Sequence, residues 1–157
     1  MKSIPSLHEW VGGNDALQRL CEAFYKKVLA DELIGPLFAQ MPPDHPKHVA
    51  MFLAEVMGGP GDYSAMGGHA RMLSHHFGKH LSEAQRRRWI NLLLDTADEC
   101  GIPADPEFRS AFVSYLEWGT RLAVINSQLP ADSAADAKVP MPKWGWGVPG
   151  GPYQPES

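Results

Sequence analysis

The sequence predicts an all-α fold followed by a non-helical C-terminal tail. Apolar residues recur at i, i+3 and i+4 along most of the chain, and no segment shows the alternation typical of a strand. Capping residues and Gly or Pro breaks separate the helical segments. Residues 130–157 contain six Pro and four Gly in 28 residues, a composition typical of irregular structure. We therefore expect a helical domain over 1–129 and a Pro/Gly/Trp-rich tail over 130–157.

The first predicted helix is one turn long and the second is a full amphipathic helix. Residues 6–11 form the single turn, which Gly12-Gly13 ends. Asn14-Asp15 are expected to cap the second helix, which ends near Asp31. Its apolar positions follow helical spacing: Leu17, Leu20, Cys21, Phe24, Tyr25 and Val28. A turn bent by Gly35-Pro36 follows.

The middle of the chain predicts two helices of different length. Pro42-Pro43-Asp44 open the first of them. Pro46 falls in its first turn, where a backbone N–H has no acceptor within the helix, so the missing N–H of proline costs no hydrogen bond. Gly58-Gly59-Pro60 end it. The Gly-rich stretch that follows reads as a loop, and a short helix is expected over 69–76.

Two longer helices complete the helical domain. Ser82 and Gln85 form a capping box at the start of the first, and Gly101 ends it. Asp105-Pro106-Glu107 open the second. Its expected apolar face comprises Phe108, Phe112, Tyr115, Leu116, Leu122 and Ile125.

Composition excludes several classes of protein. A formal charge of −4 argues against a nucleic-acid binder, which normally presents a basic face. No apolar run reaches the length of a membrane span, and the N-terminus lacks the apolar core of a secretory signal, so we expect a cytoplasmic protein. Cys21 and Cys100 lie in helical patterns and are expected to be buried free thiols.

The distribution of histidines leaves two kinds of metal site open. His76 and His80 are four residues apart, as two zinc ligands on one helix face would be. However, the sequence contains neither CxxC nor HExxH, and Gly78 weakens a helix between the two residues.

A haem site needs one axial imidazole, apolar walls and polar groups over the open face. His76 is a candidate for the imidazole, although spacing alone does not distinguish it from His75. Tyr25 and Trp89 lie on apolar helix faces and each carries a hydrogen-bond donor. Judged from the pattern alone, a Tyr or Trp at such a position is more often an ordinary core residue.

Residues 12–127 resemble the truncated haemoglobins of the second group, because four separate blocks of sequence agree with that family in order and spacing. The blocks are NDALQRLCEAFYKKVLADELIGPLF, MFLAEVMGGPGDYS, GGHARMLSHHFGKHLSEAQRRRW and FRSAFVSYLEWGTRLAVINS, and they span about three quarters of the chain. The family's two glycine pairs correspond to Gly58-Gly59 and Gly67-Gly68. The resemblance implies a 2-over-2 helical sandwich around haem b.

The resemblance also assigns site residues. The family's iron-binding His precedes its characteristic Trp by thirteen positions, which leads from Trp89 to His76. The distal Tyr corresponds to Tyr25, and the distal-helix positions to His45 and Val49. Many members of the group have a small residue where this chain has His45, which leaves three roles open for it: a ligand donor, a gate or an iron ligand. The remaining residues expected around the haem are Phe38, His48, Phe52, Tyr63, Arg71, Met72, His75 and Phe77.

These assignments imply a haem-iron protein that binds O2, NO, CO or peroxide. We expect NO-dioxygenase or peroxidase-type redox activity, with Tyr25, Trp89 and His45 stabilising the ligand. The alternatives are a non-catalytic O2 binder or sensor, and a haem-free helical interaction module. The chain has no flavin or nicotinamide domain, so turnover would require an electron-donating reductase as partner. A homodimer stays open, and neither a nucleic acid nor a membrane is expected as a partner.

Overall fold

The protein is described by a computed structural model over residues 3–147 and 150–152. Within these residues it contains helices and no strand, as the sequence predicts. The α-helices are α1 (Leu7–Val11), α2 (Gly13–Ala30), α3 (His45–Val56), α4 (Gly68–Ser74), α5 (Glu83–Glu99) and α6 (Pro106–Ser127). Two short 3-10 helices, η1 (Gly35–Phe38) and η2 (Ser64–Met66), lie between them. No helix in the described ranges is long and apolar enough to cross a membrane.

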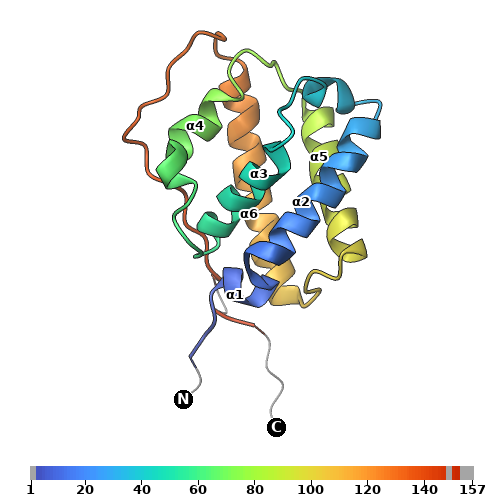
Figure 1. Ribbon diagram of the computed structural model, residues 1–157, viewed down its shortest axis with the longest axis vertical. Coiled ribbons are helices and arrows are strands. Elements are labelled where there is room, and N and C mark those ends of the chain that lie inside the picture. The colour runs from blue at the N-terminus through green and yellow to red at the C-terminus, as the bar shows by residue number, and fades with distance from the viewer. Residues whose placement is uncertain (1–2, 148–149, 153–157) are drawn as a thin grey trace.

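The four long helices form two pairs, which is the predicted 2-over-2 arrangement. α2 packs against α3, and α5 packs against α6 behind them (Figure 1). Large apolar side chains from all four helices fill the space between the pairs, among them Leu17, Phe24, Leu53, Leu93, Phe108 and Phe112. The short helix α4 lies at the edge of this sandwich, on the side away from α2 (Figure 1).

The capping box predicted at Ser82 and the helix start predicted at Asp105 are confirmed, whereas the cap predicted for α2 is wrong. Ser6 and Ser82 both form capping boxes, and the Asp105 side chain accepts a hydrogen bond from the Phe108 N–H at the start of α6. By contrast, α2 already begins at Gly13 with Gly12 as its cap. Asn14 is therefore inside the helix, and its side-chain oxygen lies 2.6 Å from His8 Nε2.

The short helix α4 ends earlier than the sequence predicts. Its last residue is Ser74, so His75 and His76 lie in the turn that follows. Gly78 adopts a φ of 75° in this turn, a left-handed conformation that glycine reaches without steric strain. His76 is therefore carried by this turn and not by α4 itself.

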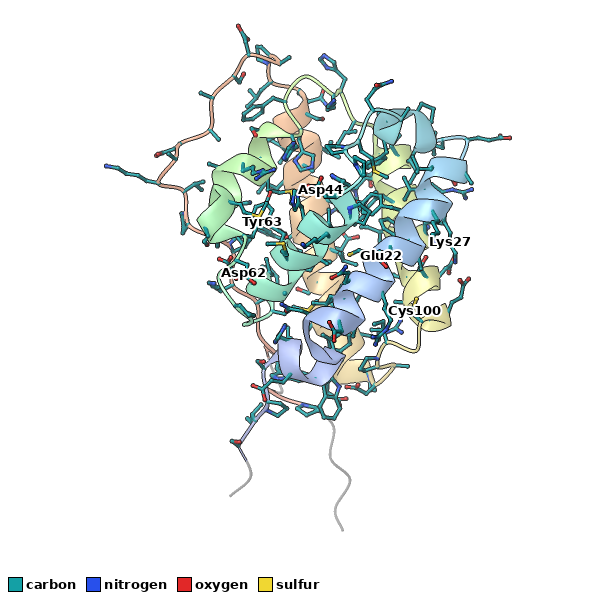
Figure 2. All side chains as sticks on the ribbon, in the orientation of Figure 1. Glu22, Lys27, Asp44, Asp62, Tyr63 and Cys100 are labelled. Carbon is teal, nitrogen blue, oxygen red and sulfur yellow. The ribbon has the colours of Figure 1, made fainter. Side chains whose placement is uncertain are left out.

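Two expected burials are wrong. Cys21 is buried as predicted, but Cys100 is exposed because it caps the end of α5 rather than lying within it (Figure 2). Ile125 is 67% exposed, although Ser127 in the same last turn of α6 is fully buried. The end of α6 is therefore packed on one side only, and Ile125 lies on the other side.

The tail is non-helical throughout its described part, residues 130–147 and 150–152, as predicted. It leaves the end of α6, passes outside α4 and returns to the region of α1 (Figure 1). Trp144 and Trp146 pack against the core, so these two aromatics anchor the tail on this molecule's own surface.

Candidate functional site

A largely apolar cavity of about 680 Å³ lies between the helices. This volume falls within the range of about 300–1,000 Å³ typical of sites for small molecules and cofactors. The structure brings all but one of the residues predicted for the site to its walls: Tyr25, Phe38, His45, His48, Val49, Phe52, Tyr63, Arg71, Met72, His75, His76 and Trp89. They come from α2, η1, α3, α4, α5 and the intervening loops. In Figure 2, Tyr63 lies between α3 and α4.

Phe77 is the predicted residue that does not line the cavity. Its side chain is buried, yet it is absent from the cavity walls. Phe77 directly follows His76 in the turn after α4. The expectation that Phe77 contacts the cofactor is therefore not supported by its position.

His76 reaches the cavity wall from the turn after α4. Its Nδ1 atom is buried without a hydrogen-bond partner among the described residues. Burial, together with the neighbouring His75 and His45, lowers the pKa of its imidazole to about 4. The imidazole is thus neutral near pH 7, which is the form that coordinates a metal ion.

Tyr25 and Trp89 lie together on the part of the wall made by α2 and α5. The Trp89 indole is near enough to the Tyr25 oxygen to act against the rise in the pKa of the phenol. Phe24 holds both rings, with centroid distances of 4.9 Å to Tyr25 and 5.1 Å to Trp89. Burial raises the pKa of the Tyr25 phenol far above its usual range, so this group keeps its proton. A protonated Tyr25 hydroxyl at the cavity wall is able to donate to a ligand.

His45 lies beside this pair, at the start of α3. Its ring is 4.8 Å from the Tyr25 ring and 6.0 Å from Phe38. Its Nε2 atom is buried and has no partner among the described residues. Burial, with contributions from His75 and His48, lowers the pKa of His45 to about 4, so its imidazole is neutral near pH 7. A neutral imidazole has one donor and one acceptor.

One side of the cavity carries several basic groups near the surface. His48, Arg71 and His75 were expected there, and His48 Nε2 also lies 3.3 Å from the Asp44 carboxylate. Lys79 lines the same cavity and was not predicted. Its position three residues after His76 was the available signal, because a tight turn brings such a residue back toward the same side.

Sequence reasoning also missed the contribution of α6 and of a buried arginine. Tyr115 and Trp118 on α6 line the cavity, although the sequence indicated only a supporting role for this helix. Arg86 is 5% exposed, lines the cavity and donates to Glu83 and Glu117. Its position three residues before Trp89 on an amphipathic helix was the signal for its burial.

The residues present fit a haem better than zinc. Within the residues that the structure describes, no three metal-ligating side chains cluster as a zinc site requires. A haem instead needs one neutral imidazole, apolar walls and cationic groups for its two carboxylates. The unpartnered His76, the apolar lining, and Arg71 with Lys79 at the same cavity meet these three requirements.

Comparison with known proteins agrees with this fit. The model of the bacterial-like globin family matches residues 6–118. The group 2 truncated haemoglobin YjbI of Bacillus subtilis is 25% identical over 116 residues, covering 74% of this chain and 86% of that protein. A group 1 truncated haemoglobin of Tetrahymena pyriformis is 32% identical over 103 residues, covering 65% of this chain and 82% of the relative.

Solved structures show the same fold. A thermostable haemoglobin of Thermobifida fusca superposes with a TM-score of 0.67 at 27% identity, covering 76% of this chain and 97% of that one. A group II truncated haemoglobin of Bacillus anthracis gives a TM-score of 0.71 at 20% identity, over 84% of this chain and 98% of that chain. The chain therefore belongs to the bacterial-like globin family and is a truncated haemoglobin, with haem b as its cofactor and O2 and related small molecules as its ligands.

Proposed function

We propose that His76 is the axial ligand of the haem and that Tyr25, Trp89 and His45 stabilise a ligand on the opposite face. The single observation that carries this proposal is the convergence of three polar side chains on α2, α3 and α5 in a cavity that is otherwise apolar. His76 enters the same cavity from the turn after α4. Arg71, His75, His48 and Lys79 would pair with the haem carboxylates.

The bound haem supplies ligand binding to iron and one-electron redox chemistry. The chain supplies a donor at the cavity wall, because burial keeps the proton on the Tyr25 oxygen, and the neighbouring Trp89 would orient this hydroxyl toward a ligand. Donors held at a site of developing negative charge act most strongly where water is excluded. Tyr25 is 3% exposed, so its hydroxyl acts in such an environment.

Strong donation to the ligand suits chemistry better than transport, since slow release of O2 limits delivery. We infer that the protein oxidises NO with O2 to nitrate: NO, O2 and one electron yield one nitrate ion. The electron must come from an electron-donating partner protein or a chemical reductant. His45 favours a peroxidase-type reaction as the second candidate, because its unpartnered Nε2 is able to take a proton from peroxide and return it.

The test measures consumption of NO by the ferrous protein in air-saturated buffer with a reducing system. Stoichiometric nitrate over many turnovers supports the dioxygenase. A His45→Leu variant separates the two candidates, since it should abolish the proton transfer of the peroxidase reaction and lower NO oxidation only by as much as it weakens O2 binding. Stable O2 binding without turnover of NO or of peroxide would leave the protein a non-catalytic O2 binder.

A further inference from the structure

The segment over residues 129–147, here called the strap, begins against the turn that carries His76. The Gly78 N–H donates to the Leu129 carbonyl at 2.8 Å. A Cβ on Gly78 would lie only 2.7 Å from the Cβ of Ala131, so the two backbones are in close contact. His80 N–H adds a bond to the Ser127 carbonyl at 3.0 Å. The residues directly after His76 are therefore fastened to the end of α6 and the start of the strap.

The middle of the strap covers the outer side of the cavity wall. The His69 side chain on α4 lies near the Pro140 backbone, which acts against the lowering of its pKa by burial. The Trp144 ring packs on α6, at 5.4 Å from Tyr115 and 5.7 Å from Trp118. His69, Tyr115 and Trp118 all line the cavity on their inner side. The strap therefore packs on the outer side of α4 and α6, where these two helices form the cavity wall.

The far end of the strap is fixed to α3 and to the N-terminal segment. The Trp144 N–H donates to the Val56 carbonyl at 2.8 Å. The Trp146 indole N–H donates to the Pro5 carbonyl at 2.7 Å, and its ring lies edge-on to Trp10 at 5.9 Å. Lys143 Nζ lies 3.7 Å from the buried Glu55 carboxylate. Both ends of the strap are consequently anchored on parts of the fold other than α4.

Helix α4 has little else to hold it in place. It has seven residues, and a helix of this length is unstable by itself in water. Its backbone lies close to that of η2 and approaches other helices at few points (Figure 1). The position of α4, and of the turn with His76, therefore depends on side-chain contacts and on the strap.

We propose that the strap is a positioning element that holds α4 and the His76 turn against the haem, and that it sets how long the haem is retained. Trp144 is its principal positioning residue, because it joins the strap to both α3 and the cavity wall. The inference rests on the proposed role of His76 as axial ligand. The strap lies beyond residue 118, where the match to the globin family ends.

The test uses the full chain loaded with haem and compares it with Trp144→Ala. Two quantities are measured: the rate of haem transfer to excess apomyoglobin, and the iron–histidine stretching frequency of the ferrous protein. Loss of two aromatic contacts predicts haem transfer about tenfold faster, together with a shifted stretching frequency. Trp144→Phe should restore most of both properties. Ile125→Ala, at an exposed position of α6, is the matched control and should change neither.

A second variant, Trp146→Ala, releases the strap at an anchor outside the cavity. It should also accelerate haem transfer, and it keeps the inference testable if Trp144→Ala does not fold. The inference is overturned if the folded variants lose thermal stability but keep the parent's haem-transfer rate and stretching frequency. His76→Gly is measured alongside these variants. If it keeps the parent's iron–histidine stretching frequency, the assignment of His76 as axial ligand fails. The effect of the strap on haem retention is measured separately, by the Trp144 and Trp146 variants.

Discussion

The proximity of the Trp89 indole to the Tyr25 oxygen predicts that these residues act on a ligand as one unit. We expect Trp89 to donate to the Tyr25 oxygen and the Tyr25 hydroxyl to donate onward to the ligand. In this order, Trp89 acts largely through Tyr25. A double-mutant cycle with Tyr25→Phe, Trp89→Phe and the combined variant measures such coupling directly.

The structure sets the expected magnitudes. Tyr25→Phe removes a buried donor to a partially charged acceptor, worth about 1.5–3 kcal/mol, which corresponds to O2 release about 10–150 times faster. Trp89→Phe removes the indole N–H that is expected to orient this donor through a neutral hydrogen bond, worth about 0.5–1.5 kcal/mol, or about 2–10 times faster release. The combined variant should release O2 no faster than Tyr25→Phe, within about twofold.

The assay is stopped-flow replacement of O2 by CO in the ferrous protein. Phe24→Leu is a useful control, because it loosens the packing of both rings and keeps both donors. It should cause a smaller acceleration than Tyr25→Phe. Strictly additive effects of the two substitutions would refute coupling through Tyr25. An O2 release rate that none of the substitutions changes would refute donation to the ligand altogether.

Three further predictions concern the rest of the molecule. Replacing the buried Arg86 with Met should lower the free energy of unfolding by about 1–2 kcal/mol in urea titrations, because charge-assisted hydrogen bonds to two partly exposed carboxylates are lost. Hydrogen bonding to Arg86 and Arg87 lowers the pKa of Glu83 to about 2. The stabilisation by Glu83 is therefore complete above pH 4.5 and is lost as the pH falls toward 2. The parent protein should lose more stability than Arg86→Met over this range, and equal losses would contradict the pairing of Glu83 with Arg86. A thiol reagent should modify Cys100 within minutes in the native protein and Cys21 only after unfolding, since burial raises the pKa of Cys21 to about 12; two reactive thiols in the native state would contradict the packing of α2.

Much of the fold could be predicted from local signals in the sequence. The capping boxes at Ser6 and Ser82 and the breaks at Gly58 and Gly101 depend on neighbouring residues alone. The start of α2 was misplaced because Gly12 serves both as the end of α1 and as the cap of α2, a double use that no local propensity indicates.

The composition of the site was harder to predict, because it depends on contacts between distant segments. Spacing could not separate His75 from His76, and the resemblance to a known family made that choice. The structure has both residues at the cavity but gives the buried, unpartnered nitrogen to His76. The path of the strap depends on aromatic contacts such as Trp144 with Trp118, which pair residues from separate elements.

Haem binding by His76→Gly, with and without added imidazole, tests the central claim most directly. The parent should bind one haem per chain and show an iron–histidine stretch in the resonance Raman spectrum of the ferrous form. The variant should lose this band and most of its haem affinity, and imidazole should restore both. A variant that keeps the parent's affinity and spectrum would show that another residue binds the iron.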